Sequence, residues 1–177
     1  MTIKAAFDST TLITCCQGIV EGKPVIEHVL AVCAVSVPAA VQIEVVTAGA
    51  GFPDAQLAAN LIKSAQIPVY NVSLPTGNVL EHYKLGLGEK ETIALCLERT
   101  DEFDFLVTDD RLAYIVSRRC GIPTCLFLDL VIHLVERNVW KRDFAEKVVQ
   151  SVQVRFSGGF VPHTLKILER GTRICLT

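Results

Sequence analysis

The feature that most constrains the fold is an apolar run at residues 103–107 that ends abruptly at Thr108, Asp109 and Asp110. A helical pattern over residues 112–120 follows at once. A buried strand that ends in acids and leads into a helix is typical of an open α/β sheet, where ligands bind beyond the carboxyl ends of the strands. We therefore expect these acids to face a binding crevice.

The rest of the chain repeats this alternation of apolar strands and amphipathic helices. Further strands are predicted at 3–7, 32–37, 68–72 and 122–127, and helices at 23–31, 38–49, 54–66, 89–99, 128–137, 140–153 and 160–170. Such alternation predicts a mainly parallel sheet of four to five strands with right-handed crossovers and helices on both faces. We expect a single domain over 1–177, with a core of about 1–137 and a C-terminal helical extension of about 138–177.

Composition narrows the class of protein. The formal net charge of −2 over 177 residues gives no whole-molecule attraction to nucleic acid, so a polyanion must use a local patch. Seven cysteines without a CxxC pair predict buried, reduced thiols and argue against zinc. The start of the chain lacks a basic segment followed by an apolar one, and no apolar run reaches the roughly 18 residues of a membrane span. We expect a cytoplasmic protein with no membrane partner.

Asp8 closes the first apolar run and is the only Asp, Glu, Lys or Arg between Lys4 and Glu21. Ser9 and Thr10 follow it at the start of a predicted helix. Asp8 is therefore either a functional carboxylate at the same sheet edge as Asp109 and Asp110, or a residue that only caps the helix.

Glu44 stands alone in an apolar helix, because no other charged residue occurs between Glu27 and Asp54. Such a carboxylate is exposed, paired, protonated or bound to a cation. In the helix over 89–99, a rotation of about 100° per residue places Glu89 on the apolar stripe and Glu91 on the opposite side. Periodicity favours Glu89 as the inward acid, although the helix dipole alone also explains acids in a first turn.

Several carboxylates at one sheet edge imply a hard divalent cation. Like charges within ~4 Å repel by several kcal/mol per pair, so a positive charge must offset them. No histidine adjoins these acids, and all-oxygen ligation suits Mg²⁺ or Mn²⁺. Hydrolysis of phosphodiesters is the chemistry that such a site favours, with phosphoryl transfer as its competitor.

Four short motifs in order carry a resemblance to a known family. They are Phe7-Asp8-Ser9-Thr10, Pro38-x2-Val41-x2-Glu44-Val45, Leu87-Gly88-Glu89-Lys90-Glu91 and Val107-Thr108-Asp109-Asp110-Arg111. The chain resembles the PIN-domain family, the metal-dependent ribonuclease fold of VapC-like toxins, and in particular its branch of predicted nucleic-acid-binding proteins. The helix after Gly159 is similar to the C-terminal helix of that branch. The resemblance implies a three-layer α/β/α sandwich.

The resemblance also implies an endoribonuclease that depends on Mg²⁺ or Mn²⁺. It would be a toxin that is paired with a small antitoxin protein, and it would form a homodimer. The resemblance implies catalytic roles for Asp8, Glu44, Glu89 or Glu91, and Asp110, with the metal held by Asp8, Glu89 or Glu91, and Asp109 or Asp110. An acid two residues after the threonine favours Asp110 as the metal contact and Asp109 as its neighbour or a helix cap. Ser9, Thr10 and Thr108 would orient carboxylates, and Lys84, Lys90, Arg111, Arg118 and Arg119 are candidates for the RNA backbone.

Two alternatives remain at this stage. The branch usually carries an arginine a few residues after its acidic pair, where this chain has Tyr114, so a non-catalytic RNA- or protein-binding module is the first. An acidic phosphotransfer site is the second, but it favours an aspartate where Thr10 stands. His133 lies in an apolar helix and is expected in the core or at an interface.

Overall fold

A parallel five-stranded sheet organises the computed structural model, which describes residues 2–48, 51–74 and 77–171. The sheet strands are β1 (Ile3–Phe7), β4 (Cys33–Pro38), β5 (Val69–Tyr70), β6 (Phe105–Val107) and β7 (Thr124–Cys125). A separate hairpin pairs β2 (Ile19–Val20) with β3 (Lys23–Pro24). The helices are α1 (Ser9–Gln17), α2 (Val25–Leu30), α3 (Ala39–Ala48), α4 (Pro53–Lys63), α5 (Leu87–Glu98), α6 (Arg111–Arg119), α7 (Phe127–Glu136), α8 (Arg142–Ser151) and α9 (Phe160–Arg170), with 3-10 turns η1 (Val79–His82) and η2 (Gln153–Arg155).

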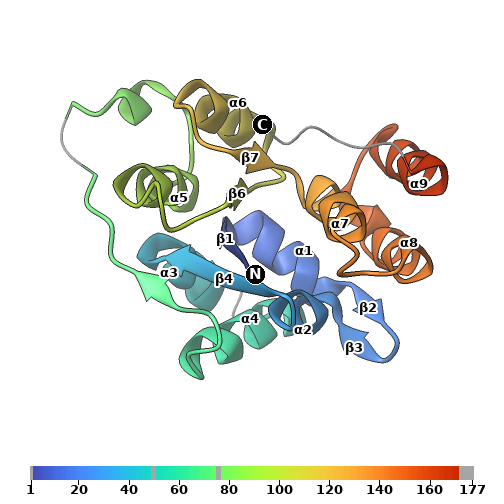
Figure 1. Cartoon of the computed structure of the whole chain (residues 1–177). Helices are drawn as coiled ribbons and strands as arrows, with labels where there is room; N and C mark the ends of the chain where they lie inside the picture. Colours follow the sequence, from blue (N-terminus) through green and yellow to red (C-terminus); the bar gives the residue numbers. More distant parts are fainter. Residues whose placement is uncertain (1, 49–50, 75–76, 172–177) are drawn as a thin grey trace.

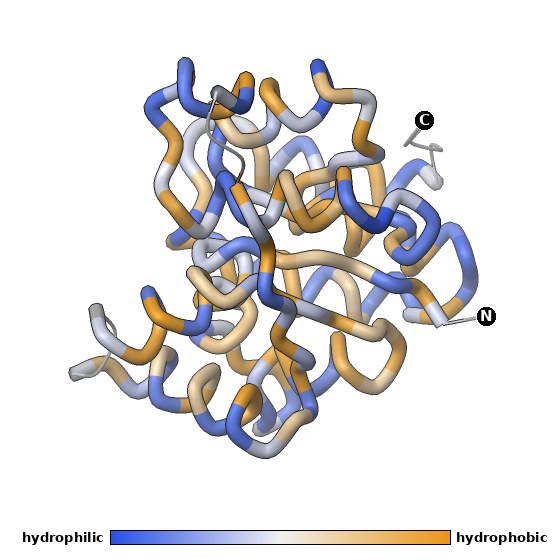
Figure 2. The backbone as a smooth tube through the Cα atoms, turned by 90° about the vertical axis from the view of Figure 1, so that its left-hand side faces the viewer, coloured by the Kyte–Doolittle hydropathy of each residue, from blue (hydrophilic) through white to orange (hydrophobic). Residues whose placement is uncertain are grey.

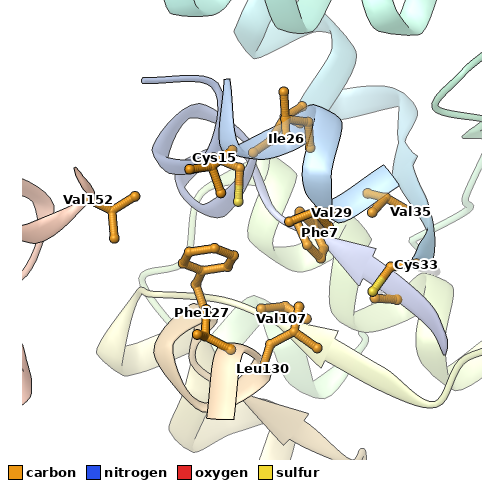
Figure 3. Packing of buried hydrophobic residues seen from close by; sticks show 14 of the residues in the cluster. Phe7, Cys15, Ile26, Val29, Cys33, Val35, Val107, Phe127, Leu130 and Val152 are labelled. Atoms are coloured by element: carbon orange, nitrogen blue, oxygen red, sulfur yellow. The ribbon is translucent and has the colours of Figure 1, made fainter. Parts of the chain in front are cut away.

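The sheet has a hydrophobic layer on each face, which confirms the predicted three-layer sandwich. Ala5 and Phe7 of β1 join a large cluster with α1, α2, α4, α7 and α8, whereas Ala6 joins a second cluster with α5 and α6. Successive strand residues point to opposite faces, so both faces of one strand are buried. Figure 3 shows Phe7 and Val107 packed near Phe127 within the first cluster. Hydrophobic segments gather inside the fold, and hydrophilic ones recur at its outer turns (Figure 2).

The strand order places a topological switch at the centre of the sheet (Figure 1). The order is β5-β4-β1-β6-β7, so the chain moves outward from β1 to β5 and then returns to lay β6 on the other side of β1. Phe7 pairs with Val107 in register. Ligands of open α/β sheets bind at such a switch point, and Asp8 and Thr108 are the first residues beyond these two paired strands.

The structure shortens two predicted strands and adds a hairpin that the periodicity did not reveal. The predicted strands 68–72 and 122–127 contain only Val69–Tyr70 and Thr124–Cys125, and α7 already begins at Phe127. The helix predicted over 23–31 begins at Val25 because Lys23–Pro24 pairs with Ile19–Val20. Glu21 and Gly22 both have positive φ at the turn of this hairpin, which is the geometry of the tight turns that join antiparallel strands.

The C-terminal helices pack against the sandwich, since α8 and α9 contact one another and both contact α7. Residues 172–177 of the predicted C-terminal extension, and the end of the helix predicted to reach residue 49, lie outside the described residues. Six of the seven cysteines are free thiols, five of them buried, and Cys175 lies outside the description. Among the described residues no helix has the length and apolar character needed to cross a membrane.

Candidate active site

Asp8 connects the two central strands at the carboxyl edge of the sheet. It directly follows β1 and is only 1% exposed. Its Oδ1 accepts a hydrogen bond from the backbone N–H of Thr11 at 2.7 Å, and its Oδ2 accepts one from Thr108 Oγ1, just beyond β6, at 2.5 Å. Asp8 therefore caps α1 and is also fixed to the end of the neighbouring strand. Burial raises its pKa, although the bonds from Thr108 and Thr11 oppose the shift.

The two acids after β6 have different partners. Asp110 Oδ1 accepts from the backbone N–H of Ala113 at 2.7 Å and caps α6. Asp109 Oδ1 accepts from the backbone N–H of Phe127 at the start of α7 at 3.0 Å. Asp109 was expected to be either the neighbour of the metal contact or a helix cap, and the structure excludes it as the cap of α6, because α6 begins at Arg111 and Asp110 is its cap. Both carboxylates nevertheless lie against helix N-termini.

Glu44 projects from α3 onto the N-terminus of α5. Its Oε1 accepts a hydrogen bond from the backbone N–H of Gly88 at 2.9 Å, so the isolated carboxylate is paired with backbone rather than free. A Cβ built at Gly88 would lie 2.5 Å from Glu44 Oε2. A side chain at position 88 would therefore displace the Glu44 carboxylate from this position, a packing reason for glycine that the sequence motif alone did not supply.

Glu89 and Glu91 are both partly buried, but they accept hydrogen bonds at the N-termini of different helices. Glu89 Oε2 accepts from the backbone N–H of Gly86 at 2.7 Å, which is the glutamate half of a capping box, since the glycine at the N-cap has no side chain to form the other half. Glu91 Oε2 accepts from the backbone N–H of Ala40 at 2.8 Å, at the start of α3. Glu91 therefore does not point away into solvent beside Glu98, because α3 packs against α5 on that side.

Electrostatics group Glu89 with three other acids. Burial raises the pKa of Glu89, and the charges of Asp110, Asp8 and Glu44 raise it further. The charge of Asp110 likewise raises the pKa of Asp8. These interactions define the acidic site, by which we mean Asp8, Glu44, Glu89 and Asp110. Glu91 contributes to none of these shifts, and it caps α3 at the border of the site.

Asp109 also borders the acidic site, on the side of α7. Burial raises its pKa to about 7, the charge of Asp8 adds to the shift, and the bond from Phe127 and the charge of Arg155 oppose it. Its Oδ2 is buried and has no hydrogen-bond partner among the described residues. An unpaired buried carboxylate oxygen is costly, which explains why this group favours the protonated form.

Helix N-termini offset the concentration of negative charge. Asp8 accepts from a backbone N–H of α1, Asp110 from one of α6, and Glu44 from one of α5. The N-terminus of a helix carries a partial positive charge and unsatisfied N–H groups, which stabilise carboxylates. The fold thus stabilises Asp8, Asp110 and Glu44 next to one another.

The oxygens that remain suit a hard divalent cation. Asp110 Oδ2, Glu89 Oε1 and Glu44 Oε2 accept no hydrogen bond from the residues described. All are carboxylate oxygens, the ligands that Mg²⁺ and Mn²⁺ prefer. Within residues 2–48, 51–74 and 77–171, however, no three acid, histidine or cysteine side chains already converge tightly enough to hold an ion. The donor set fits the metal, and the carboxylates would have to move inward onto it.

Two hollows border the acidic site. The α3–α4 hollow, of about 510 Å³, is lined by Ser9, Thr10, Ile13, Glu44, Val45, Phe52, Asp54, Ala55 and Arg155. The α6–α9 hollow, of about 620 Å³, is lined by Asp109, Arg111, Tyr114, Leu126, Arg155, Phe156, Ser157 and Phe160. Arg155 lines both and donates to Thr14 Oγ1 at 3.4 Å. Sequence reasoning missed Arg155, because it follows α8 and only the fold returns it to the acids.

Only some of the remaining predicted site residues lie near the acidic site. Thr108 bonds to Asp8 as expected, whereas Ser9 and Thr10 line the α3–α4 hollow. Of the predicted RNA contacts, Arg111 lines the α6–α9 hollow. Lys84, Lys90, Arg118 and Arg119 are absent from the described linings of both hollows, and the last two lie at the far end of α6.

His133 lies in the last turn of α7, is half-buried, and packs edge-on against Phe105. Burial lowers its pKa, and its Nε2 has no partner among the described side chains and backbone groups. This placement agrees with a core histidine and does not bring it to the acidic site.

Comparison with known proteins identifies the family. A family model described as "DUF3368: PIN domain" matches residues 26–165, which include Glu44, Glu89 and Asp110. A search of curated proteins found no match. The match spans most of the chain, agrees with the parallel sheet, and includes the last three of the four sequence motifs, whereas the motif around Asp8 precedes it. The chain therefore belongs to the PIN-domain family.

Proposed function

We propose that this chain is an endoribonuclease that hydrolyses RNA phosphodiester bonds with Mg²⁺ or Mn²⁺ at the acidic site. PIN domains are generally nucleases and typically use divalent metal ions. The observation that carries the proposal is the convergence of acids from four elements: Asp8 and Asp110 lie at the ends of the paired strands β1 and β6 and both bond to Thr108, and Glu44 of α3 bonds to the start of α5, where Glu89 lies. The charges of Asp8, Asp110 and Glu44 also act on Glu89. A structural role for one acid would not require four of them to share a site at the switch point of the sheet.

Each acid of the site has its own role in the proposed reaction. Asp8 is held by Thr11 and Thr108 and gives the site a fixed point between β1 and β6. Asp110 and Glu44 are oriented by Ala113 and Gly88, and each keeps one oxygen available. Glu89 likewise keeps one oxygen available, Oε1, because Gly86 binds only Oε2.

A divalent ion bound by these carboxylates would supply a Lewis acid that polarises the phosphate and lowers the pKa of a bound water. Arg111 and Arg155 are the basic side chains that line the hollow next to the acids, and they would hold the RNA backbone. Arg111 and Arg155 would form a local basic patch for RNA, which the whole molecule, with a net charge of −2, does not attract.

The biological role that we propose rests on the resemblance to VapC-like toxins. A toxin restrained by a small antitoxin protein, a homodimeric state and a cytoplasmic location remain predictions from it. A non-catalytic RNA-binding module is the competing function, and a cleavage assay separates the two.

The test is cleavage of end-labelled RNA by the wild-type protein and by Asp8→Asn and Asp110→Asn, with Mn²⁺, with Mg²⁺ and with EDTA. We expect metal-dependent cleavage by the wild type and a loss of at least ~100-fold in each variant, because each removes an anionic oxygen from the site. Circular dichroism confirms that the variants are folded. Equal activity in all three proteins, or undiminished activity in EDTA, would overturn the proposal.

A further inference from the structure

Two hydrogen bonds connect α3 and α5 in opposite directions beside the acidic site. Glu44 of α3 accepts from the backbone N–H of Gly88 of α5 at 2.9 Å. Glu91 of α5 accepts from the backbone N–H of Ala40 of α3 at 2.8 Å. In each bond the donor is the second residue of its helix, and the acceptor lies about one turn into the other helix. The two helices lie next to one another (Figure 1), and we call this pair the reciprocal bonds.

Neither helix has a side-chain cap at the residue that precedes it. Pro38 directly precedes α3 and Gly86 directly precedes α5, and neither residue has a side-chain acceptor. The first N–H groups of a helix have no partner within that helix, so their acceptors come from elsewhere. Ala40 and Gly88 are both buried, so solvent does not supply the acceptor. Each helix therefore depends on an acid of the other helix at its second residue.

We propose that Glu91 is a positioning residue of the acidic site, which acts through the reciprocal bonds to hold Glu44 and Glu89 in place. Glu91 fixes Ala40, which lies one turn before Glu44 on the same face of α3. Glu44 in turn fixes Gly88, the residue directly before Glu89. This inference rests on the proposed function, because it names the residue that orients the two acids of α3 and α5 in the same metal site.

The hydrogen bond of Glu91, and not its charge, carries this role. Without the Glu91 carboxylate, the buried N–H of Ala40 would have no acceptor. A buried donor without a partner costs free energy, so the first turn of α3 would shift toward another acceptor and carry Glu44 away from Gly88. The charge of Glu91 is not among the causes that raise the pKa of Asp8 or Glu89. An amide oxygen at position 91 should therefore suffice.

The first test is amide hydrogen exchange at Gly88 in the metal-free protein, followed by NMR. Glu91→Ala removes the acceptor for Ala40, whereas Glu91→Gln keeps it. Glu98→Ala is the charge-matched control, because Glu98 is the exposed last residue of α5. We expect exchange at Gly88 to be about tenfold faster in Glu91→Ala and unchanged in the other two variants. Alanine favours the helix, so fraying of α5 itself would not explain this result.

The second test is the affinity of the metal-free protein for Mn²⁺, measured in a double-mutant cycle with Glu44→Ala. We expect Glu91→Ala to bind Mn²⁺ about tenfold more weakly than the wild type, because residues that orient metal ligands contribute to affinity. Glu91→Gln should bind within about threefold of the wild type. Since Glu91 acts through Glu44, the double variant should bind Mn²⁺ no more weakly than Glu44→Ala alone.

The outcomes separate this inference from the proposed function. If the wild type cleaves RNA with Mn²⁺ but Gly88 exchanges equally in the wild type and Glu91→Ala, the positioning role is overturned and the ribonuclease stands. If Gly88 exchanges faster in Glu91→Ala but the wild type cleaves no RNA, the positioning role stands and the ribonuclease fails. Equal losses in Glu91→Gln and Glu91→Ala, or additive losses with Glu44→Ala, also overturn the inference.

Discussion

The acidic site has two halves that are built in different ways. The strand half, Asp8 and Asp110, stands at the ends of the paired strands β1 and β6, and Thr108 connects the two. The helix half, Glu44 and Glu89, stands on α3 and α5, and Gly86 and Gly88 hold it. Hydrogen bonds along a sheet fix the first half, whereas the packing of two helices fixes the second. The helix half is therefore the part of the site that sequence reasoning leaves open and that small changes can displace.

The largest expected difference lies between two acids of α5. Glu89→Gln should lower RNA cleavage by about 100-fold, because Glu89 shares the charge of the acidic site. Glu91→Gln should change the rate less than about threefold, since an amide oxygen can still accept the hydrogen bond from Ala40. Rates measured for both variants at saturating Mn²⁺ check this pair. Equal losses would mean that the acidic site also contains Glu91.

A smaller effect is expected from Gly88→Ala, which changes only the helix half. The added methyl group would meet Glu44 Oε2 at 2.5 Å and displace the carboxylate, so cleavage should fall about tenfold. Alanine in place of glycine within a helix favours folding by up to about 1 kcal/mol, so the variant should not lose stability. Activity and urea denaturation are measured together. Full activity would show that Glu44 need not remain on Gly88.

The third prediction concerns stability and not the rate of cleavage, and it tests Asp109 at the border of the strand half. Burial raises the pKa of Asp109 to about 7 from its ordinary value of 3.8, so the folded state binds more protons than the unfolded state between these values. The protonated Asp109 therefore contributes stability that is fully present below pH 3.8 and is lost as the pH rises from 3.8 to about 7, by up to about 4 kcal/mol. The lowered pKa of His133 acts in the opposite direction, with a loss of stability as the pH falls below its normal value of 6.5.

Metal-free protein and its Asp109→Asn variant, unfolded in urea at pH 5 and pH 8, isolate the Asp109 contribution. The wild type should lose more stability than the variant between the two values, because an asparagine side chain at this position cannot ionise. An identical pH dependence in both proteins would show that Asp109 ionises in the folded state as easily as in the unfolded one.

The two halves also differ in how far the sequence determines them. Apolar runs that end at Asp8 and at Thr108 were sufficient to predict two strands and the edge they share, because local periodicity encodes both. The bond between Glu44 and Gly88 depends on how α3 packs against α5, and the capping of α3 by Glu91 depends on the same contact. Periodicity favoured Glu89 as the inward acid, but no local pattern encodes the contacts that give Glu44 and Glu91 their partners.

The α6–α9 hollow was beyond sequence reasoning for a similar reason. Arg155 and Phe160 lie more than forty residues after Asp110, and α8 and α9 must return against α7 before they border the acids. The hairpin of β2 and β3 was missed because two-residue strands leave no periodicity to detect.

Binding of Mn²⁺ to the metal-free protein, followed by electron paramagnetic resonance of the free ion, tests the central claim most directly. We predict that wild-type protein and Glu91→Gln bind one or two ions, and that Asp110→Asn and Glu89→Gln bind at least ~tenfold more weakly. Failure of the wild-type protein to bind Mn²⁺ at millimolar concentration, or equal binding by Asp110→Asn, would contradict a metal centre formed by Asp8, Glu44, Glu89 and Asp110.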